Sequence, residues 1–502
     1  MGIKNFFTWF RNNDLFKDSV LKHVPPVYTD HILIDMNGII HQAAQQVYKY
    51  GKYANAQQPC SVQIPERLQK YINRNIPQTL QEQRQQLEID LFENVKTQVN
   101  AILKMVIPIK TVFLAVDGVA PKSKQNQQRQ RRFRAAEERT PGSFDSACIT
   151  AGTDFMQRLC DHITDKSWLD IKPSTSYIFS SHSVPGEGEH KLIEWIKNSE
   201  QELDSFTVVG LDADLILLCL CLDKKNVCIL REKEFKGYDL IDIDIARQNL
   251  ERKNVKVSDI LVWSCFLGND FLPPVPSLEI KESFPEQGAF EFFFDNYKNP
   301  LIVQTVENKN VLNFKEIKRL LTLLSTREQS IMNGRQVEEK ISYSKTREGK
   351  PITRFTNPLW KGDIEKYRRE YFTTKLVKTS TDAEATEEKA ISLFLKTVYW
   401  VFLYYTKHTR LDWNWFYPYN YTLHAADFVD HMKDAYDFEF DTSTTPCHHH
   451  EQLLRVVPPQ SKNILPEFLR DRLEEINQNF VYEVDFAGKR FEWEAVTIVN
   501  NV

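Results

Sequence analysis

The first 300 residues alternate short apolar stretches with helical patterns, and this alternation limits the possible folds more than any other feature of the chain. Five stretches are short, apolar and rich in β-branched residues, as buried parallel strands are. They are 31–35, 111–117, 176–180, 206–210 and 226–230. Helical patterns lie between or after them, at 87–106, 125–139, 189–199 and 242–252. The alternation predicts an α/β fold, a parallel sheet with helices on both faces.

The rest of the chain follows a different pattern, and we expect three parts. Residues 1–325 hold the predicted sheet and form the core. Residues 326–385 are charged and mostly lack long apolar runs, which favours a linker or an insertion. Residues 386–502 begin with an aromatic helix at 391–405 and are expected to form a second, mostly helical block that braces the core.

Charge, cysteines and hydropathy exclude few functions but indicate a compartment. The chain has 64 Lys and Arg against 68 Asp and Glu, a net charge of −4, so any basic surplus that a nucleic-acid binder needs would be local. The eight cysteines have no C-x-x-C spacing and several lie in apolar runs, which indicates free thiols. We find no signal peptide and no apolar run that could span a membrane. We therefore expect an intracellular protein, cytoplasmic or nuclear, without a membrane partner.

Acidic residues follow the predicted strands at the point where each strand ends. Asp35 closes the first strand and Asp117 the second, and Asp212 and Asp214 come directly after the fourth. The carboxyl ends of parallel strands meet at one edge of a sheet, where ligands of α/β proteins bind. Three more acids lie in predicted loops: Glu187, Glu189 and Asp270. We expect all of these carboxylates to share one crevice.

So many carboxylates cannot remain ionised together without cations. Hard oxygen ligands select Mg²⁺, and Mn²⁺ can substitute for it. Two such ions about 4 Å apart can hold the attacking water and the leaving oxygen of a phosphoryl displacement. A single acid at a strand end is more often a helix cap or a turn former. That explanation is much weaker for all seven acids together, so we predict a catalytic centre that binds two metal ions.

A basic helix begins directly after the second predicted strand. On a helix, Lys124, Gln128, Arg131 and Arg132 fall at i, i+4, i+7 and i+8, which places them on one face. A lysine, an amide and two guanidinium groups on one face can form a pocket for a phosphate. An exposed basic helix is the common alternative. The short distance in sequence from Asp117 favours a phosphate held close to the metal ions.

These segments resemble the Xrn-type 5′→3′ exoribonucleases, a family that degrades decapped or cleaved RNA. The chain is similar to the N-terminal nuclease region of that family at 33–41, 116–129, 144–150, 184–191, 210–215 and 267–278, and later at 457–462 and 488–493. The resemblance implies a core like that of flap endonucleases and PIN domains. It assigns metal binding to the seven acids and the 5′-monophosphate pocket to the face with Lys124. It also implies that the pocket rejects capped and triphosphate ends by their size.

The resemblance extends to base stacking. His41 matches the residue that stacks on a base near the 5′ end, and either Trp413 or Trp415 matches its aromatic partner. The chain departs from the family pattern at Thr8, where a basic residue is usual. It also has no Cys-Cys-His-Cys knuckle, and the run Cys447 to His450 is interpreted as a polar loop.

The expected reaction is hydrolysis of single-stranded RNA with a 5′-monophosphate end to 5′-mononucleotides, and single-stranded DNA is left open as a second substrate. One alternative is a structure-specific flap-type DNA endonuclease, which does not need a pocket for a terminal monophosphate. Another is a catalytically inactive RNA-binding scaffold, which has little reason to keep a costly cluster of acids.

Overall fold

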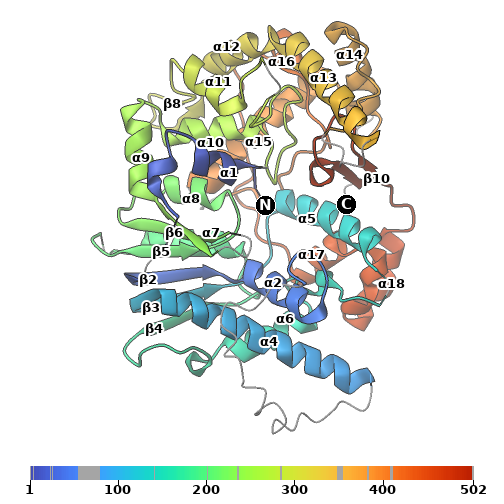
Figure 1. Ribbon diagram of the computed structural model, residues 1–502. Helices are drawn as coiled ribbons and strands as arrows, with labels where there is room; N and C mark the ends of the chain where they lie inside the picture. The colour runs from blue at the N-terminus through green and yellow to red at the C-terminus, as the bar shows by residue number, and fades with distance from the viewer. Residues whose placement is uncertain are drawn as a thin grey trace.

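The fold of the chain comes from a computed structural model. It describes the residues of the chain apart from positions 1, 4, 23, 25, 55–79, 141, 201, 234–236, 283–284, 348–353, 381–383, 407–410 and 500–502. Within the described part, helices outnumber strands and surround one large sheet (Figure 1).

The large sheet has seven strands among the described residues, in the order β1-β7-β6-β5-β2-β3-β4. Five neighbouring strands of this sheet run parallel to one another. They are β2 (Val27–Asp35), β3 (Val106–Ala115), β4 (Ser176–Ser180), β5 (Phe206–Val209) and β6 (Val227–Glu232). They confirm the predicted parallel arrangement for these five strands, and the sheet as a whole is mostly parallel. The antiparallel strands β7 (Tyr238–Asp242) and β1 (Val20–Leu21) complete one edge and were not predicted. β1 is only two residues long, too short to leave a pattern in the sequence.

Helices cover both faces of the sheet because side chains along each strand alternate between the two faces. Ile32 and Ile34 face a core shared with α2 (Met36–Tyr48), α4 (Leu80–Met105) and α6 (Asp154–Ile163). Leu33 faces the opposite core, shared with α7 (Gly188–Asn198), α8 (Leu215–Leu220), α9 (Ile243–Arg252) and α10 (Val257–Phe266). Figure 1 shows α4 below the sheet and α10 above it.

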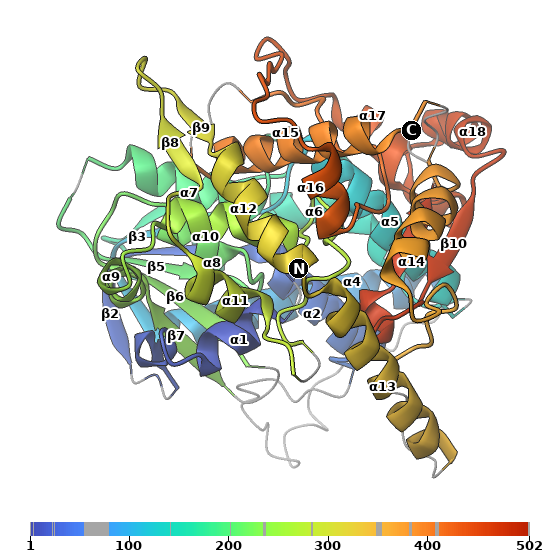
Figure 2. The same ribbon diagram turned by 90° about the horizontal axis from the view of Figure 1, so that it is seen from above.

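A further layer of helices extends the second core. It comprises α1 (Phe6–Asn12), α11 (Ala289–Asn296), α12 (Phe314–Ser325), the aromatic helix α15 (Glu387–Thr406) and α16 (Ala425–His431). Trp263 of α10 and Trp400 of α15 are both fully buried there. The segment 326–385 contains α13 (Glu328–Arg347) and α14 (Ile364–Tyr371), and Figure 2 shows both at the side of the molecule. The small hairpin of β8 (Ile302–Gln304) and β9 (Asn310–Leu312) lies outside the large sheet.

The basic helix α5 (Lys122–Glu138) packs against elements from the end of the chain. These are α17 (His449–Val456), α18 (Glu467–Ile476) and the pair β10 (Tyr482–Asp485) and β11 (Val496–Val499), which Figure 1 shows around α5. The Arg129 guanidinium donates to the Arg455 carbonyl at 2.7 Å and to Asn477 Oδ1 at 2.9 Å. The amide of Ala120, just before α5, donates to Gln452 Oε1 at 2.8 Å. Residues that are far apart in sequence thus fix the position of α5.

Two further findings concern the whole described chain. None of its helices has the length and hydropathy needed to cross a membrane. Seven cysteines are free thiols, four of them buried, and Cys60 lies outside the described residues.

Candidate active site

Asp35 and Asp117 lie at the ends of the adjacent strands β2 and β3, and Asn37 joins them. Asp35 caps α2 and accepts a hydrogen bond from the Asn37 amide at 3.3 Å. The Asn37 side chain donates to Asp117 Oδ2 at 2.8 Å and accepts from the Asp117 amide at 3.0 Å. The two acids are therefore held at one edge of the sheet, as strand order alone predicts.

The start of α7 brings two more acids to this edge. The Gly188 amide donates to Asp117 Oδ1 at 2.7 Å, so Glu187 and Glu189 flank a residue that contacts the cluster directly. A Cβ atom on Gly188 would lie 2.6 Å from Asp35 Oδ1. Only glycine fits this close approach without displacing the carboxylate.

Asp212 and Asp214 follow β5, the other neighbour of β2, and complete a group that could hold a metal ion. Carboxylate oxygens of Glu189, Asp212 and Asp214 all lie within 4.8 Å of one another. Glu189 Oε2 and Asp214 Oδ1 are buried and have no hydrogen-bond partner among the described residues. Burial and the neighbouring acids raise the pKa of Glu189 well above its ordinary value, and burial also raises the pKa of Asp214. Unpartnered buried carboxylate oxygens fit a bound cation, which would supply the missing charge.

Lys124 connects the basic helix to the acids. Its ammonium group lies 2.5 Å from Glu187 Oε2 and 2.7 Å from Asp270 Oδ2. Burial raises the pKa of Glu187 to about 7, although Lys124 opposes the rise. Lys124 is itself buried, at 6% exposure, so its charge acts at short range in a region of low dielectric. The residue that the sequence assigns to a phosphate pocket thus also neutralises two of the acids.

The other residues predicted for a phosphate pocket, Gln128, Arg131 and Arg132, also belong to α5. Arg132 donates to Gln128 Oε1 at 3.3 Å, while Arg131 is exposed to solvent. Burial and the charge of Arg131 lower the pKa of Arg132 to about 9. Burial, together with the charges of Arg131 and Arg132, lowers the pKa of His41 to about 4. His41 therefore belongs to the surroundings of the two arginines, and its ring is neutral near pH 7.

The structure separates the two candidate tryptophans. The Trp413 carbonyl accepts from the Lys122 amide at 2.9 Å, which places Trp413 beside the first turn of α5. The Trp415 indole donates to Thr397 Oγ1 on α15 at 3.1 Å, and the Lys396 ammonium lies 4.2 Å from the centre of the Trp415 ring. The Trp413 backbone thus contacts the first turn of α5, whereas the Trp415 side chain contacts α15.

Several residues of the site were not predicted. The Tyr404 hydroxyl donates to Glu187 Oε1 at 2.8 Å, and the Tyr405 hydroxyl donates to Asp214 Oδ2 at 3.3 Å. Both tyrosines belong to α15, whose aromatic sequence indicates only core packing. The Lys191 ammonium donates to the carbonyls of Val116 and Ser181 and holds the loop after β3. Of these residues, Asn37 is the one that the sequence could have indicated, because it lies two residues after Asp35, an acid at the end of a strand.

Comparison with known proteins matches this chain to two protein-family models. The model of the XRN 5′-3′ exonuclease N-terminus matches residues 1–84, 73–142 and 137–233. The model of the Xrn1 helical domain matches residues 249–356 and 359–502, which is half of the chain. The two matches together cover every acid described above.

Curated relatives of this chain are named as 5′-3′ exoribonucleases or as a homolog of one. Over 99% of its length, this chain is 26% identical to human 5′-3′ exoribonuclease 1, of which it covers 33%. It is 23% identical to 5′-3′ exoribonuclease 1 of Schizosaccharomyces pombe, with coverage of 99% of this chain and 47% of the relative. It is 24% identical to the 5′-3′ exoribonuclease 2 homolog of Drosophila melanogaster, with coverage of 99% and 69%. The chain thus spans a third to a half of the first two relatives.

Proposed function

Because the chain belongs to the XRN 5′-3′ exonuclease family, we propose that it is a 5′→3′ exoribonuclease that degrades single-stranded RNA from a 5′-monophosphate end. One observation carries the proposal: the buried acids lie close enough to α5 for Arg131 to act electrostatically on Asp212 and for Asp117 to act on Arg132. The acids suit metal-assisted hydrolysis, and the arginines suit a terminal phosphate. The core would have the architecture of flap endonucleases and PIN domains.

The metal ligands are proposed to be the acids around the ends of β2, β3 and β5. They are Asp35, Asp117, Glu187, Glu189, Asp212, Asp214 and Asp270. Two Mg²⁺ ions bound there, or Mn²⁺ in their place, would supply an activated water and neutralise charge on the leaving oxygen. The protein's own part is to hold the acids in place, through Asn37 and Gly188 at the sheet edge and through Tyr404 and Tyr405 from α15.

The basic face of α5 would select the 5′ end. Arg131 and Arg132 would bind the terminal monophosphate, with Gln128 oriented by its hydrogen bond to Arg132. Lys124 would bridge the phosphate and the acids, since it already contacts Glu187 and Asp270. A triphosphate would exceed the pocket in size and charge.

Base stacking would hold the first nucleotides without selecting a sequence. His41 is neutral near pH 7, so its ring can stack without an added charge. Trp413 is the better candidate for its partner because it adjoins α5, whereas Trp415 is engaged with α15. Stacking is also available to single-stranded DNA, which makes DNA a second substrate to test.

The test uses one labelled RNA with either a 5′-monophosphate or a 5′-triphosphate end, in Mg²⁺ and in EDTA. We expect mononucleotides from the monophosphate RNA in Mg²⁺ alone, and none from Asp212→Ala. Replacing both Arg131 and Arg132 by alanine should remove most of the preference for a monophosphate. Arg134→Ala is the matched control, because Arg134 lies on the same helix but pairs with Glu138.

Other outcomes would select the alternatives. Internal cuts that ignore the 5′ end would favour a flap-type endonuclease, and the same assay on flapped DNA would then show cleavage. RNA binding without cleavage in any metal would favour an inactive scaffold. Degradation of a single-stranded DNA of the same sequence would extend the substrate class.

A further inference from the structure

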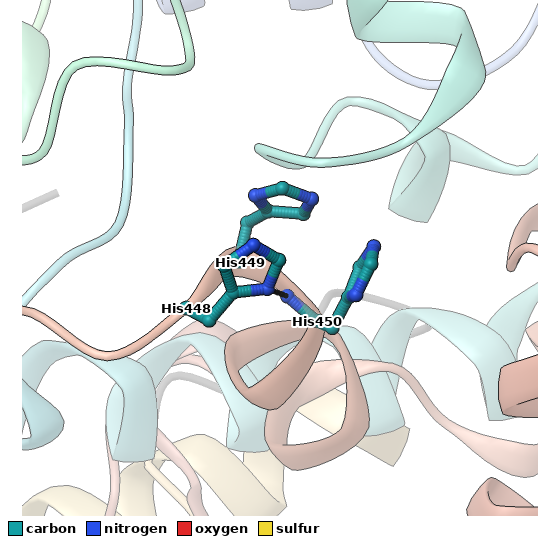
Figure 3. A group of neighbouring side chains, drawn as sticks. All are labelled: His448, His449 and His450. Atoms are coloured by element: carbon teal, nitrogen blue, oxygen red, sulfur yellow. Dashed lines mark hydrogen bonds between the residues drawn. The ribbon is translucent and has the colours of Figure 1, made fainter.

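Two groups of side chains in the described part of the chain bring metal-ligating atoms within 4.8 Å of one another. One belongs to the acids above. The other consists of His448, His449 and His450 at the start of α17, and Figure 3 shows the three rings gathered there. Their ring centres lie 4.0 to 4.5 Å apart. The three imidazole rings thus occupy one small region, and their close packing calls for a physical explanation.

The surrounding structure fits the His449 ring closely. A Cβ atom on Gly152 would lie 2.5 Å from His449 Cδ2, so only glycine lets the ring rest on the turn before α6. Gly152 has a φ of 92°, a conformation that other residues rarely adopt. The Gly152 amide also donates to His182 Nδ1 at 3.3 Å, which brings a fourth imidazole to this turn. The His450 ring packs at 5.1 Å, edge to face, against Phe468 of α18.

The chemistry of the three side chains selects the kind of metal ion. His448 Nδ1 accepts only a long bond of 3.3 Å from the His450 amide, which a metal ion could replace. Neutral imidazole nitrogens are preferred ligands of Zn²⁺ and related transition metals, whereas Mg²⁺ prefers oxygen.

We propose that His448, His449 and His450 form a site for a transition-metal ion of the Zn²⁺ type, with water as the fourth ligand. The site is structural, because it is built at the junction of α17 with the Gly152 turn and α18. α17 also carries Gln452 and Arg455. Gln452 Oε1 accepts a hydrogen bond from the Ala120 amide, and the Arg455 carbonyl accepts one from the Arg129 guanidinium of α5. A metal ion that fixes the three rings would therefore steady the helix that supports α5.

The test is a titration of metal-stripped protein with Zn²⁺ in excess Mg²⁺, which keeps the acids occupied. Calorimetry should give one Zn²⁺ per chain for the wild type. Replacing all three histidines by alanine should abolish this binding, and His449→Ala alone should weaken it about tenfold or more. His431→Ala, an exposed histidine at the end of α16, is the matched control and should bind normally.

Two further measurements keep the outcomes separate. Glu189→Gln should retain the Zn²⁺ site, and loss of Zn²⁺ binding in that variant would place the ion among the acids instead. If the triple variant does not fold, the visible spectrum of the wild type with Co²⁺ decides. An intense tetrahedral band that Mg²⁺ does not remove supports the site. Absence of that band, or Zn²⁺ binding that survives the triple substitution in a folded protein, overturns it.

Discussion

Two clusters of buried and partly buried ionisable side chains differ in how their charges are balanced. The cluster at the candidate active site consists of acids, and the Lys124 ammonium group pairs with two of them. The second cluster pairs arginines with glutamates across α13, the loop before α11 and the end of the chain. Its members are Arg335, Arg354, Arg490, Glu279, Glu282 and Glu338.

The balance decides the protonation of each acid. Burial alone would raise the pKa of Glu279, but Arg335 and Arg354 hold it at about 2. In the active site, burial and nearby acids raise the pKa of Glu189 well above its ordinary value. Arg335 and Glu282 also line a cavity of about 1110 Å³, and none of the seven acids lines it. A balanced cluster can hold elements together by itself, whereas an unbalanced one is complete only with added cations.

Removing an acid from the unbalanced cluster should cost activity rather than stability. We expect Asp214→Asn to lower single-turnover RNA cleavage by about 10³-fold or more, which corresponds to several kcal/mol of lost transition-state stabilisation. In EDTA the variant should be as stable as the wild type or more stable, because it relieves repulsion among buried acids. Urea unfolding checks the second part. Marked destabilisation in EDTA would mean that Asp214 is held by compensating partners, as in the balanced cluster.

The same kind of change in the balanced cluster should have the opposite result. Glu279→Gln removes one counter-charge of Arg335 and Arg354, which keep Glu282 and Glu338. We expect a loss of about 1–3 kcal/mol in the free energy of unfolding. Cleavage per folded molecule should change little, since Glu279 lies outside the acid cluster. Glu388→Gln is the control, because Glu388 and Lys433 form an exposed pair and its loss should hardly register. If the Glu279 variant has normal stability, the ion-pair cluster around Arg335 and Arg354 does not stabilise the fold.

The same contrast explains what the sequence could and could not predict. The four strand-end acids were predictable because strand order brings the ends of β5, β2 and β3 to one edge. Tyr404 and Tyr405 were not, because their contacts with Glu187 and Asp214 depend on how α15 packs on the core. Composition alone does not predict a long-range contact.

Two sequence features have an explanation in the packing of the structure. The helical patterns named from the sequence do not include a helix directly after Asp35, where Gly38 lies in the first turn. The structure has α2 there, and a Cβ atom at position 38 would lie 2.9 Å from Leu211 Cδ1, so packing requires the glycine. Charge in the segment 326–385 indicated a linker or an insertion. Two of its charged residues, Arg335 and Arg354, are buried and form ion pairs with Glu282 and Glu279. The role of the segment as a separate part stays a prediction.

The two clusters should also give opposite dependences of stability on pH in EDTA. Glu187 has a folded pKa of about 7 against an ordinary 4.5, so folding takes up a proton and stability falls as pH rises between these values. Glu279 has a folded pKa of about 2, so stability falls as pH drops from 4.5 toward 2. Each change in the free energy of unfolding should total about 3 kcal/mol over its pH range.

Chemical unfolding across pH 2–8 measures both slopes. Glu187→Gln, or Mg²⁺ added to the wild type, should remove the upper slope and leave the lower one. Glu279→Gln should do the reverse. A single slope that neither substitution changes would assign the pH dependence to other groups.

The smallest expected effect concerns Lys124, the cation that partly balances the acids. Lys124→Gln should tighten Mg²⁺ binding in the absence of RNA by about 1 kcal/mol, roughly fivefold, because a like charge next to the metal ions is lost. Affinity for a 5′-monophosphate should fall at the same time. Lys122→Gln is the control, since Lys122 lies on the same helix but faces Phe416 at 4.6 Å. Calorimetry with Mg²⁺ alone gives the answer. Weaker binding in Lys124→Gln would mean that the ammonium positions Glu187 and Asp270 as ligands, so that even the unbalanced cluster depends on an ion pair for its geometry.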